Sequence, residues 1–111
     1  MVRRSFTAVL ERNAIFDAPF DTEPYEAAWA TEARCFVRVL EMDSSGPVRI
    51  AAQLSPDGLF WCNEGHAQIS LEGPGLYSFS LRDFGHWLRF HADFPQEPLR
   101  MKVMIYLVLK E

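Results

Sequence analysis

The clearest pattern in the chain is a strict alternation of apolar and other residues from Leu99 to Lys110. The odd positions are all apolar: Leu99, Met101, Val103, Ile105, Leu107 and Leu109. A period of two residues predicts a long central β-strand with one face in the core. The even positions are charged at both ends and apolar between them: Arg100, Lys102, Met104, Tyr106, Val108 and Lys110. The second face therefore carries a short apolar strip that something must cover.

Seven further segments combine alternation with flanking turn residues. We predict strands at 4–11, 34–42, 48–54, 59–63, 67–71, 77–81 and 86–94. The sequence Ser55-Pro-Asp-Gly58 has the Pro and Gly positions of a type I turn, and Glu64-Gly65 predicts another turn. Since the stretch from Asp43 to Pro47 also has turn composition, residues 34–42 and 48–54 are expected to pair as a hairpin.

Residues 13–33 interrupt this regularity. They contain two prolines and several aromatic residues, and Asp17, Asp21, Glu23 and Glu26 form a local run of four acids. This composition favours a long aromatic and acidic loop that crosses an end of the fold. Residues 25–33 fit both a helical turn and an extended chain. Whether the loop covers the second face of the C-terminal strand stays open at this point.

Seven to eight short strands separated by Gly and Pro predict an all-β fold. We expect an antiparallel, jelly-roll-like β-sandwich formed by residues 1–111 as a single domain. A hydrophobic content of 49% and an aromatic content of 14% exclude a disordered chain and favour strands. A chain of 111 residues can bury a core without a disulfide or a metal. Cys35 and Cys62 stand alone in different segments, so we expect buried free thiols.

The charge balance limits the classes of partner. A net charge of −4 removes the usual electrostatic drive for binding nucleic acid or an acidic membrane. The N-terminal residues lack the apolar core of an export signal, and no run is long enough to span a bilayer. We therefore expect a soluble cytoplasmic protein with no membrane or nucleic-acid partner.

The histidines provide the one candidate metal site. His66 and Gln68 followed by Glu72 resemble a fragment of the cupin metal motif, in which two histidines one residue apart precede a glutamate. Here Gln68 stands where the second histidine would be. One imidazole and one carboxylate are too few ligands for a divalent transition metal, so we predict no metal. His86 and His91 are five residues apart, and a regular strand would point them to opposite faces.

Catalytic motifs are absent from the sequence. Neither cysteine lies in a nucleophile signature, and no glycine-rich phosphate-binding motif occurs. The four acids of the 13–33 loop are expected to form solvated surface, because a local acidic run seldom forms a hydrolytic pair. We predict no catalytic residue and no cofactor, and an enzymatic role is the less favoured interpretation.

A resemblance appears in the segment from Gln53 to Trp61, which contains the Ser-Pro-Asp-Gly sequence and ends in Trp. The Phe84-Gly-His-Trp-Leu-Arg-Phe90 segment and the final Val-Met-Ile-Tyr-Leu-Val-Leu-Lys strand extend it. Together, residues 34–110 resemble small bacterial and phage-associated β-sandwich modules. The resemblance implies the fold and oligomeric assembly, and no catalytic residue.

Three hypotheses for function follow. The leading one is a non-catalytic, self-associating structural or binding domain, a homo-oligomer whose interface contains Met104, Tyr106, Val108 and Trp87. The second is a carbohydrate-binding module in which Trp61, Trp87 or Tyr77 stacks on sugar rings while Asp93, Gln53 or Asn63 forms hydrogen bonds. For Trp87, burial in the core is an equal alternative. The third is a small cupin-like metal-binding enzyme around His66, Gln68 and Glu72.

Overall fold

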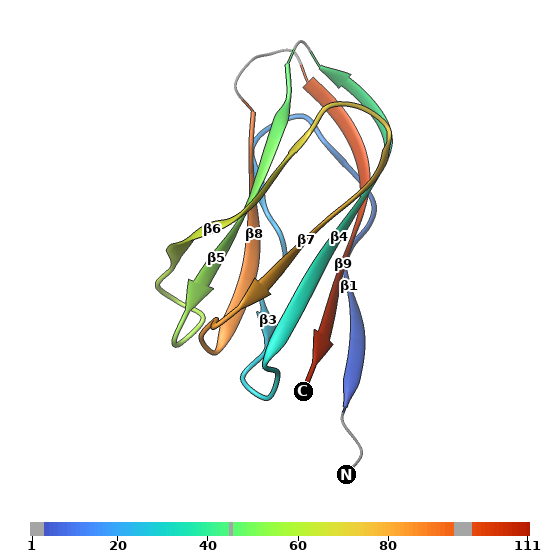
Figure 1. Cartoon of the computed structure of the whole chain (residues 1–111). Helices are drawn as coiled ribbons and strands as arrows, with labels where there is room; N and C mark the ends of the chain where they lie inside the picture. The colour runs from blue at the N-terminus through green and yellow to red at the C-terminus, as the bar shows by residue number, and fades with distance from the viewer. Residues whose placement is uncertain (1–3, 45, 95–98) are drawn as a thin grey trace.

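The computed structural model describes residues 4–44, 46–94 and 99–111, which form two antiparallel β-sheets packed face to face (Figure 1). Within these residues there are nine strands and no helix. The strands are β1 (Ser5–Phe16), β2 (Phe20–Asp21), β3 (Tyr25–Glu26), β4 (Glu32–Ser44), β5 (Val48–Ser55), β6 (Cys62–Leu71), β7 (Gly75–Arg82), β8 (Trp87–Asp93) and β9 (Leu99–Lys110). No helix among the described residues is long and apolar enough to cross a membrane.

The strand order is that of a jelly roll. One sheet has the order β1-β9-β4-β7, and the other has the order β2-β8-β5-β6 with β3 also paired to β8. The chain changes sheet at almost every connection, and the β5–β6 hairpin stays within one layer. The predicted antiparallel, jelly-roll-like sandwich is therefore confirmed. The described strands number nine because the predicted loop contributes two short ones and one strand, β6, replaces two of the eight predicted strands.

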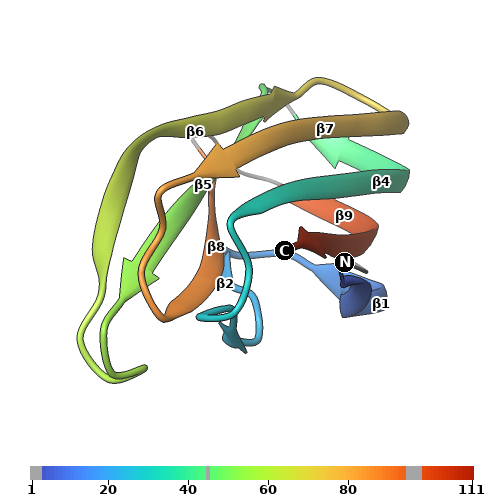
Figure 2. The same cartoon turned by 60° about the horizontal axis from the view of Figure 1, so that its bottom comes forward.

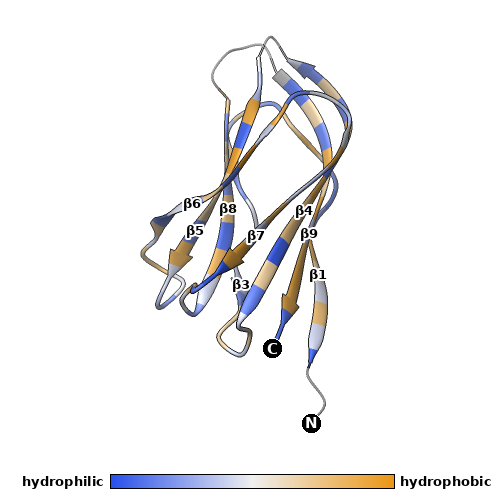
Figure 3. Ribbon diagram, in the orientation of Figure 1, coloured by the Kyte–Doolittle hydropathy of each residue, from blue (hydrophilic) through white to orange (hydrophobic). Residues whose placement is uncertain are grey.

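Strand β9 is the central element that the alternation predicts. It has the predicted bounds and pairs with β1 on one side and with β4 on the other. Its inward side chains from Met101 to Leu109 are completely buried. Phe90, Ile50 and Leu88 face them from the second sheet, and the bands of alternating hydropathy are visible along the strands in Figure 3. The two faces of one strand thus separate core from surface.

The predicted hairpin between residues 34–42 and 48–54 is wrong. Strand β4 pairs with β7 and β9, whereas β5 pairs with β6 and β8 in the opposite sheet. The connection after Ser44 is a corner between layers. A hairpin and such a corner both place the apolar side chains of two successive strands in the core, so the hydrophobic pattern alone does not distinguish them.

The segment from Leu59 to Leu71 also differs from the prediction. Residues 59–61 belong to the hairpin loop, and one strand, β6, replaces the two predicted at 59–63 and 67–71. The expected turn at Glu64-Gly65 is an irregularity within β6, opposite a register shift in β5. The Glu64 carboxylate accepts backbone hydrogen bonds from His66 and Ala67. The predicted turn is therefore wrong, because the strand continues through Glu64 and Gly65 with a local irregularity.

The region 13–33 contributes to the second sheet. Strand β1 extends to Phe16, and both β2 and β3 pair with β8. The rings of Phe16 and Phe20 stack with their centres 3.6 Å apart, which closes the edge between the two layers. Residues 25–33 are extended at β3 and then turn before β4. Figure 2 shows β2 beside β8, so this segment leaves the outer face of β9 uncovered.

Candidate functional site

The outer face of the four-stranded sheet carries the apolar strip of β9. Tyr106 lies between Val9 of β1 and Phe36 of β4 in the register of the sheet. The Tyr106 hydroxyl donates to the Met104 sulfur at 3.4 Å. Val9 is 41% exposed, and none of the described strands forms a third layer on this side of the sandwich. We call this surface, formed by the outward residues of β1, β9, β4 and β7, the outer β4–β9 face.

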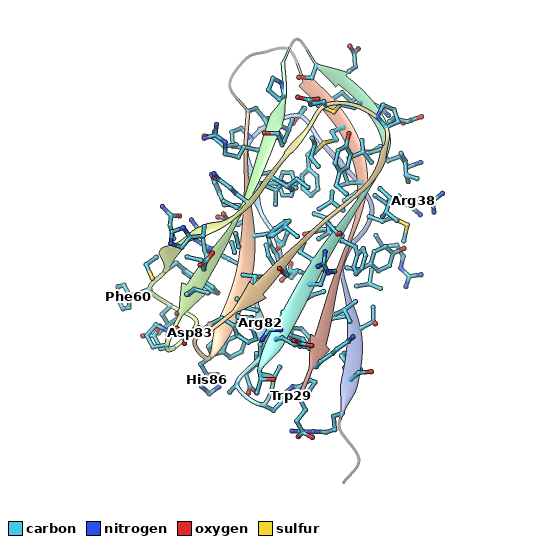
Figure 4. All side chains as sticks on the ribbon, in the orientation of Figure 1. Trp29, Arg38, Phe60, Arg82, Asp83 and His86 are labelled. Carbon is cyan, nitrogen blue, oxygen red and sulfur yellow. The ribbon has the colours of Figure 1, made fainter. Side chains whose placement is uncertain are left out.

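Charged residues flank the centre of the outer β4–β9 face. Glu32 pairs in register with Lys110 at one end, and Glu41 pairs with Lys102 at the other. Arg38 points away from the sandwich in Figure 4. A hollow of about 380 Å³ lies towards the Glu32 end and is lined by Glu32, Arg34, Phe36, Val108 and Arg82, among others. The surface thus has an apolar centre and a charged rim, the usual anatomy of a protein interface.

The outer face of the five-stranded sheet has a different character, because it carries a chain of polar contacts. Arg89 donates from Nε to Gln53 Oε1 at 2.7 Å, and Gln53 donates onward to Asn63 Oδ1 at 3.2 Å. The Arg89 guanidinium also lies 4.4 Å from the centre of the Trp61 ring. The structure therefore brings together Trp61, Gln53 and Asn63, three of the residues predicted to bind a sugar.

Asp21 completes this network from β2. Its carboxylate lies 2.7 Å from His91 Nδ1 and 3.7 Å from an Arg89 nitrogen. Sequence reasoning assigned Asp21 to solvated surface, and it missed the roles of Arg89 and His91. The missing signal was the pairing of a two-residue strand with β8, which hydrophobic periodicity cannot show because β2 is too short.

A second hollow, of about 270 Å³, lies beside the network. Ala51 is among its lining residues, and its small side chain leaves space between larger neighbours. The polar residues around the hollow are Arg49, Asn63, His66, Gln68, His91 and Asp93. The site therefore offers one guanidinium, two imidazoles, two amides and a carboxylate to a polar ligand.

Trp87 and Tyr77 belong neither to the outer β4–β9 face nor to the polar network around Arg89. Trp87 is half-buried at the end of β8, where it packs against the turn at Gly58 and stacks near His86. It is on the five-stranded sheet, so it does not share a surface with Met104, Tyr106 and Val108. Tyr77 is on β7, and its hydroxyl donates to the Gly73 carbonyl at 2.9 Å.

The three weak metal candidates do not form a cluster. His66 and Gln68 line the second hollow, whereas the backbone N–H of Glu72 donates to the Tyr77 hydroxyl at 3.3 Å. Among residues 4–44, 46–94 and 99–111, no group of three His, Cys, Asp or Glu side chains is placed to hold a metal ion. His86 and His91 contact different carboxylates, those of Glu26 and Asp21.

The two thiols are free, as expected, but only one is buried. Cys35 is completely enclosed, and this burial raises the pKa of its thiol. Cys62 is exposed at the start of β6, which corrects the expectation that both thiols are buried. The alternation of β4 places Cys35 inward, but Cys62 follows a loop whose end the sequence did not define.

Solved structures with the same fold exist. The chain is similar to the SPBc2 prophage-derived protein YomS, with 7% identity, a TM-score of 0.62 and coverage of 100% of this chain and 96% of that chain. FlhE matches at 13% identity and a TM-score of 0.55, and the match covers 98% of this chain and 95% of that chain. A protein of the disulfide-linked pili of Bacillus endospore appendages matches at 13% identity and a TM-score of 0.54, and the match covers 97% of this chain and 85% of that chain. No protein-family model and no curated protein matches the chain.

These similarities establish the fold at low sequence identity. The prophage-derived neighbour agrees, at the level of fold, with the resemblance to small phage-associated β-sandwich modules. The chain is a β-sandwich with the same fold as these proteins.

Proposed function

We propose that the protein is a non-catalytic domain that self-associates through the outer β4–β9 face. The observation that carries this proposal is the row Val9, Tyr106 and Phe36. It crosses three strands on a side of the sandwich that no other described strand covers. Apolar sheet surfaces with charged rims in globular proteins commonly mark protein contacts. A sandwich of this fold assembles into pili in Bacillus endospore appendages, so the fold is compatible with self-association.

The partner is proposed to be a second copy of this chain. Burial of the central aromatic pair supplies apolar free energy, and the rim carries both signs of charge. The residues that we assign to the interface are Met104, Tyr106, Val108, Phe36 and Val9. Trp87 is left out of this interface because it lies on the other sheet.

Sedimentation velocity over a range of concentrations tests the proposal. The wild-type protein is expected to form a larger species in the micromolar range, and Tyr106→Glu is expected to abolish it by placing a charge in the apolar centre. Gln68→Glu adds the same charge to an exposed position of the other sheet and is the matched control. Circular dichroism checks that both variants are folded. A wild-type monomer at high micromolar concentration would refute the proposal.

A second candidate function is saccharide binding on the five-stranded sheet. The observation in its favour is the Trp61–Arg89–Gln53–Asn63 network beside a polar hollow. Arg89 occupies one side of the Trp61 ring, which leaves the other side and the polar neighbours as binding elements. The positions of Asn63 and Asp93 at the hollow fit a role in hydrogen bonding to hydroxyl groups.

A glycan array and tryptophan fluorescence titrations with the best-bound sugars test this candidate. Asn63→Ala is expected to weaken binding at least several-fold, because it removes a hydrogen-bonding group from the hollow. Ser78→Ala, on the four-stranded sheet, is expected to bind as the wild type does. A silent array would remove the candidate, and equal losses in both variants would place the binding surface elsewhere.

A further inference from the structure

Building on the proposed self-association, we infer how two copies face each other. The geometry points to a two-fold axis that runs along the strands, midway between β4 and β9, in the plane between two outer β4–β9 faces. In this arrangement, β4 of each copy lies over β9 of the other. The occupant of the face is thus a second copy of this chain in one defined orientation.

The argument begins with the pattern of charges along β4. Its outward residues that pair with β9 are Glu32, Arg34, Phe36, Arg38 and, after a register shift that leaves Leu40 without a partner in the ladder, Glu41. The order of the paired residues is therefore acid, base, aromatic, base, acid about Phe36. The outward residues of β9 in the same rows are Lys110, Val108, Tyr106, Met104 and Lys102. This order is symmetric about Tyr106, with a lysine at each end. Each strand is therefore close to a palindrome, and the two strands carry opposite charges at their ends.

A rotation of 180° about an axis parallel to the strands leaves each row at the same position along the strand. It places β4 of one copy over β9 of the other. Glu32 and Glu41 also bond Arg82 and Arg100 of their own chain, at 3.0 Å and 3.1 Å. In this arrangement Glu32 faces Lys110 of the second copy, and Glu41 faces Lys102 of the second copy. Phe36 faces Tyr106 of the second copy at the centre. All four end contacts, counted over both copies, join opposite charges, which favours association and selects the register.

The first hollow has a place in this arrangement. Arg34 of the second copy stands in the same row as Val108, which is one of the residues lining the hollow. Its long side chain would lay its aliphatic part over Val108 at the edge of the hollow. The reverse contact, of Arg34 of the first copy with Val108 of the second, is identical by symmetry.

The competing arrangement has its axis across the strands. That axis places β4 over β4 and inverts the rows about Phe36. Arg34 then faces Arg38 of the second copy, Glu32 faces Glu41 of the second copy, and the two end lysines of β9 face each other. Every one of these contacts joins like charges, which disfavours association. The charge pattern therefore distinguishes the two ways of stacking the same apolar centre.

The area of the interface sets the expected strength of association between the two copies. Because the sheet order is β1-β9-β4-β7, an axis between the two inner strands overlays all four strands of one copy on all four of the other. Strand spacing and rise give about 600 Å² per copy over the rows from Glu32 to Glu41. The total of about 1,200 Å² lies at the lower limit of specific interfaces, which predicts a concentration-dependent dimer.

Crosslinking between two cysteine variants tests the orientation. All variants carry Cys62→Ser, which removes the exposed thiol, and Cys35 stays because it is buried. Facing sheets lie about 10 Å apart, which is too far for a disulfide between facing positions, so a short bismaleimide is the reagent. One mixture combines Arg38→Cys with Met104→Cys, and the other combines Arg34→Cys with Arg38→Cys. One member of each mixture carries a mass tag, so that the mixed product is resolved by size.

The inferred orientation predicts the mixed product in the first mixture and its absence from the second, because Arg34 and Arg38 of different copies then lie four residues apart along the strand. The reverse result in a sample that sedimentation shows to be dimeric would overturn the orientation and leave the proposed function standing. A dimer that gives the mixed product in both mixtures or in neither would also overturn it. A protein that stays monomeric at high micromolar concentration would overturn the proposed function itself.

Discussion

The guanidinium of Arg89 lies 4.4 Å from the centre of the Trp61 ring, and this contact joins the β5–β6 hairpin loop to strand β8. It holds the end of the loop in place and leaves Leu59 and Phe60 projecting, 76% and 77% exposed. Phe60 is visible at the tip of this loop in Figure 4. The loop is thus fixed at its base while its most apolar residues face solvent.

Removal of the Trp61 ring should weaken the base of this loop. Trp61→Ala is expected to lower the free energy of unfolding by about 1 kcal/mol, because it removes a cation–π contact at a half-buried site. Urea denaturation followed by circular dichroism measures the change. Leu59→Ala is the control from the exposed tip of the same loop, and its stability should equal that of the wild type. Equal losses in both variants would show that the Arg89 contact is not the cause.

Gly58 is a position where the backbone requires glycine. Its φ is +79°, and an added Cβ would lie 3.4 Å from the Trp87 ring. Gly58→Ala is expected to lower the free energy of unfolding by about 1–2 kcal/mol because of the left-handed backbone. Gly73→Ala is the matched control, since a Cβ there meets nothing within 4 Å and its φ is ordinary. Thermal denaturation of both variants measures the difference, and a neutral Gly58→Ala would contradict the turn geometry.

The two faces of β9 allow the same substitution to be compared on opposite sides of one strand. Val103 is completely buried, so Val103→Ala is expected to cost about 2–3 kcal/mol of stability through lost burial and a cavity. Val108→Ala, on the outer face, is expected to cost less than about 1 kcal/mol in the dilute monomer. Chemical denaturation at low protein concentration checks both values. Similar costs would mean that the outer face is covered within a single chain.

The Asp57 carboxylate should give the hairpin loop a pH dependence. Backbone N–H groups of Leu59 and Phe60 donate to it at 2.9 Å and 3.1 Å, and these bonds lower the pKa of Asp57 below its ordinary value. Because the pKa is lowered, the ionised Asp57 carboxylate stabilises the folded loop at neutral pH. This stabilisation is lost as the pH falls through the pKa of Asp57 in the folded protein. Amide hydrogen exchange at Leu59 and Phe60 is the measurement. Asp57→Asn should speed their exchange at neutral pH, and Asn13→Ala should not.

The thiols should differ in reactivity. A thiol reagent is expected to modify one cysteine in the folded protein, Cys62, and two after unfolding, because Cys35 is enclosed and burial raises the pKa of its thiol. The unfolded thiol ionises at a lower pH than the folded one, so Cys35 makes the protein less stable as the pH rises above the ordinary thiol pKa. Cys35→Ala should remove this alkaline loss. Modification of both thiols under native conditions would contradict the burial of Cys35.

Side-chain alternation predicted which residues of a strand point into the core, because such a strand has one buried face. The bounds of β9 and the inward positions of β4 follow directly from the period of two. The partner of each strand did not follow, since a corner and a hairpin give β4 and β5 the same pattern. Likewise, Asp21 and Arg89 meet only because a two-residue strand pairs with β8, and nothing local in the sequence encodes that contact.

For the candidate surfaces too, the sequence showed what belongs to a single strand but not what depends on the pairing of strands. The apolar strip of Met104, Tyr106 and Val108 was visible in the sequence, because it is a property of a single strand. Its neighbours Val9 and Phe36 were missed, since their places beside Tyr106 depend on the register between strands. The sequence therefore identified the residues of one strand, and the structure was needed to extend them to a surface.

The position of β9 between β1 and β4 has a consequence for biosynthesis. Of the nine described strands, β9 is made last, and it fills the gap between two strands made much earlier. The four-stranded sheet can therefore close only after this segment has been translated. Until then β1 and β4 have exposed edges, which are prone to pair with other chains. Such long-range pairing also slows folding. The nascent chain should therefore depend on chaperones until Lys110 has emerged.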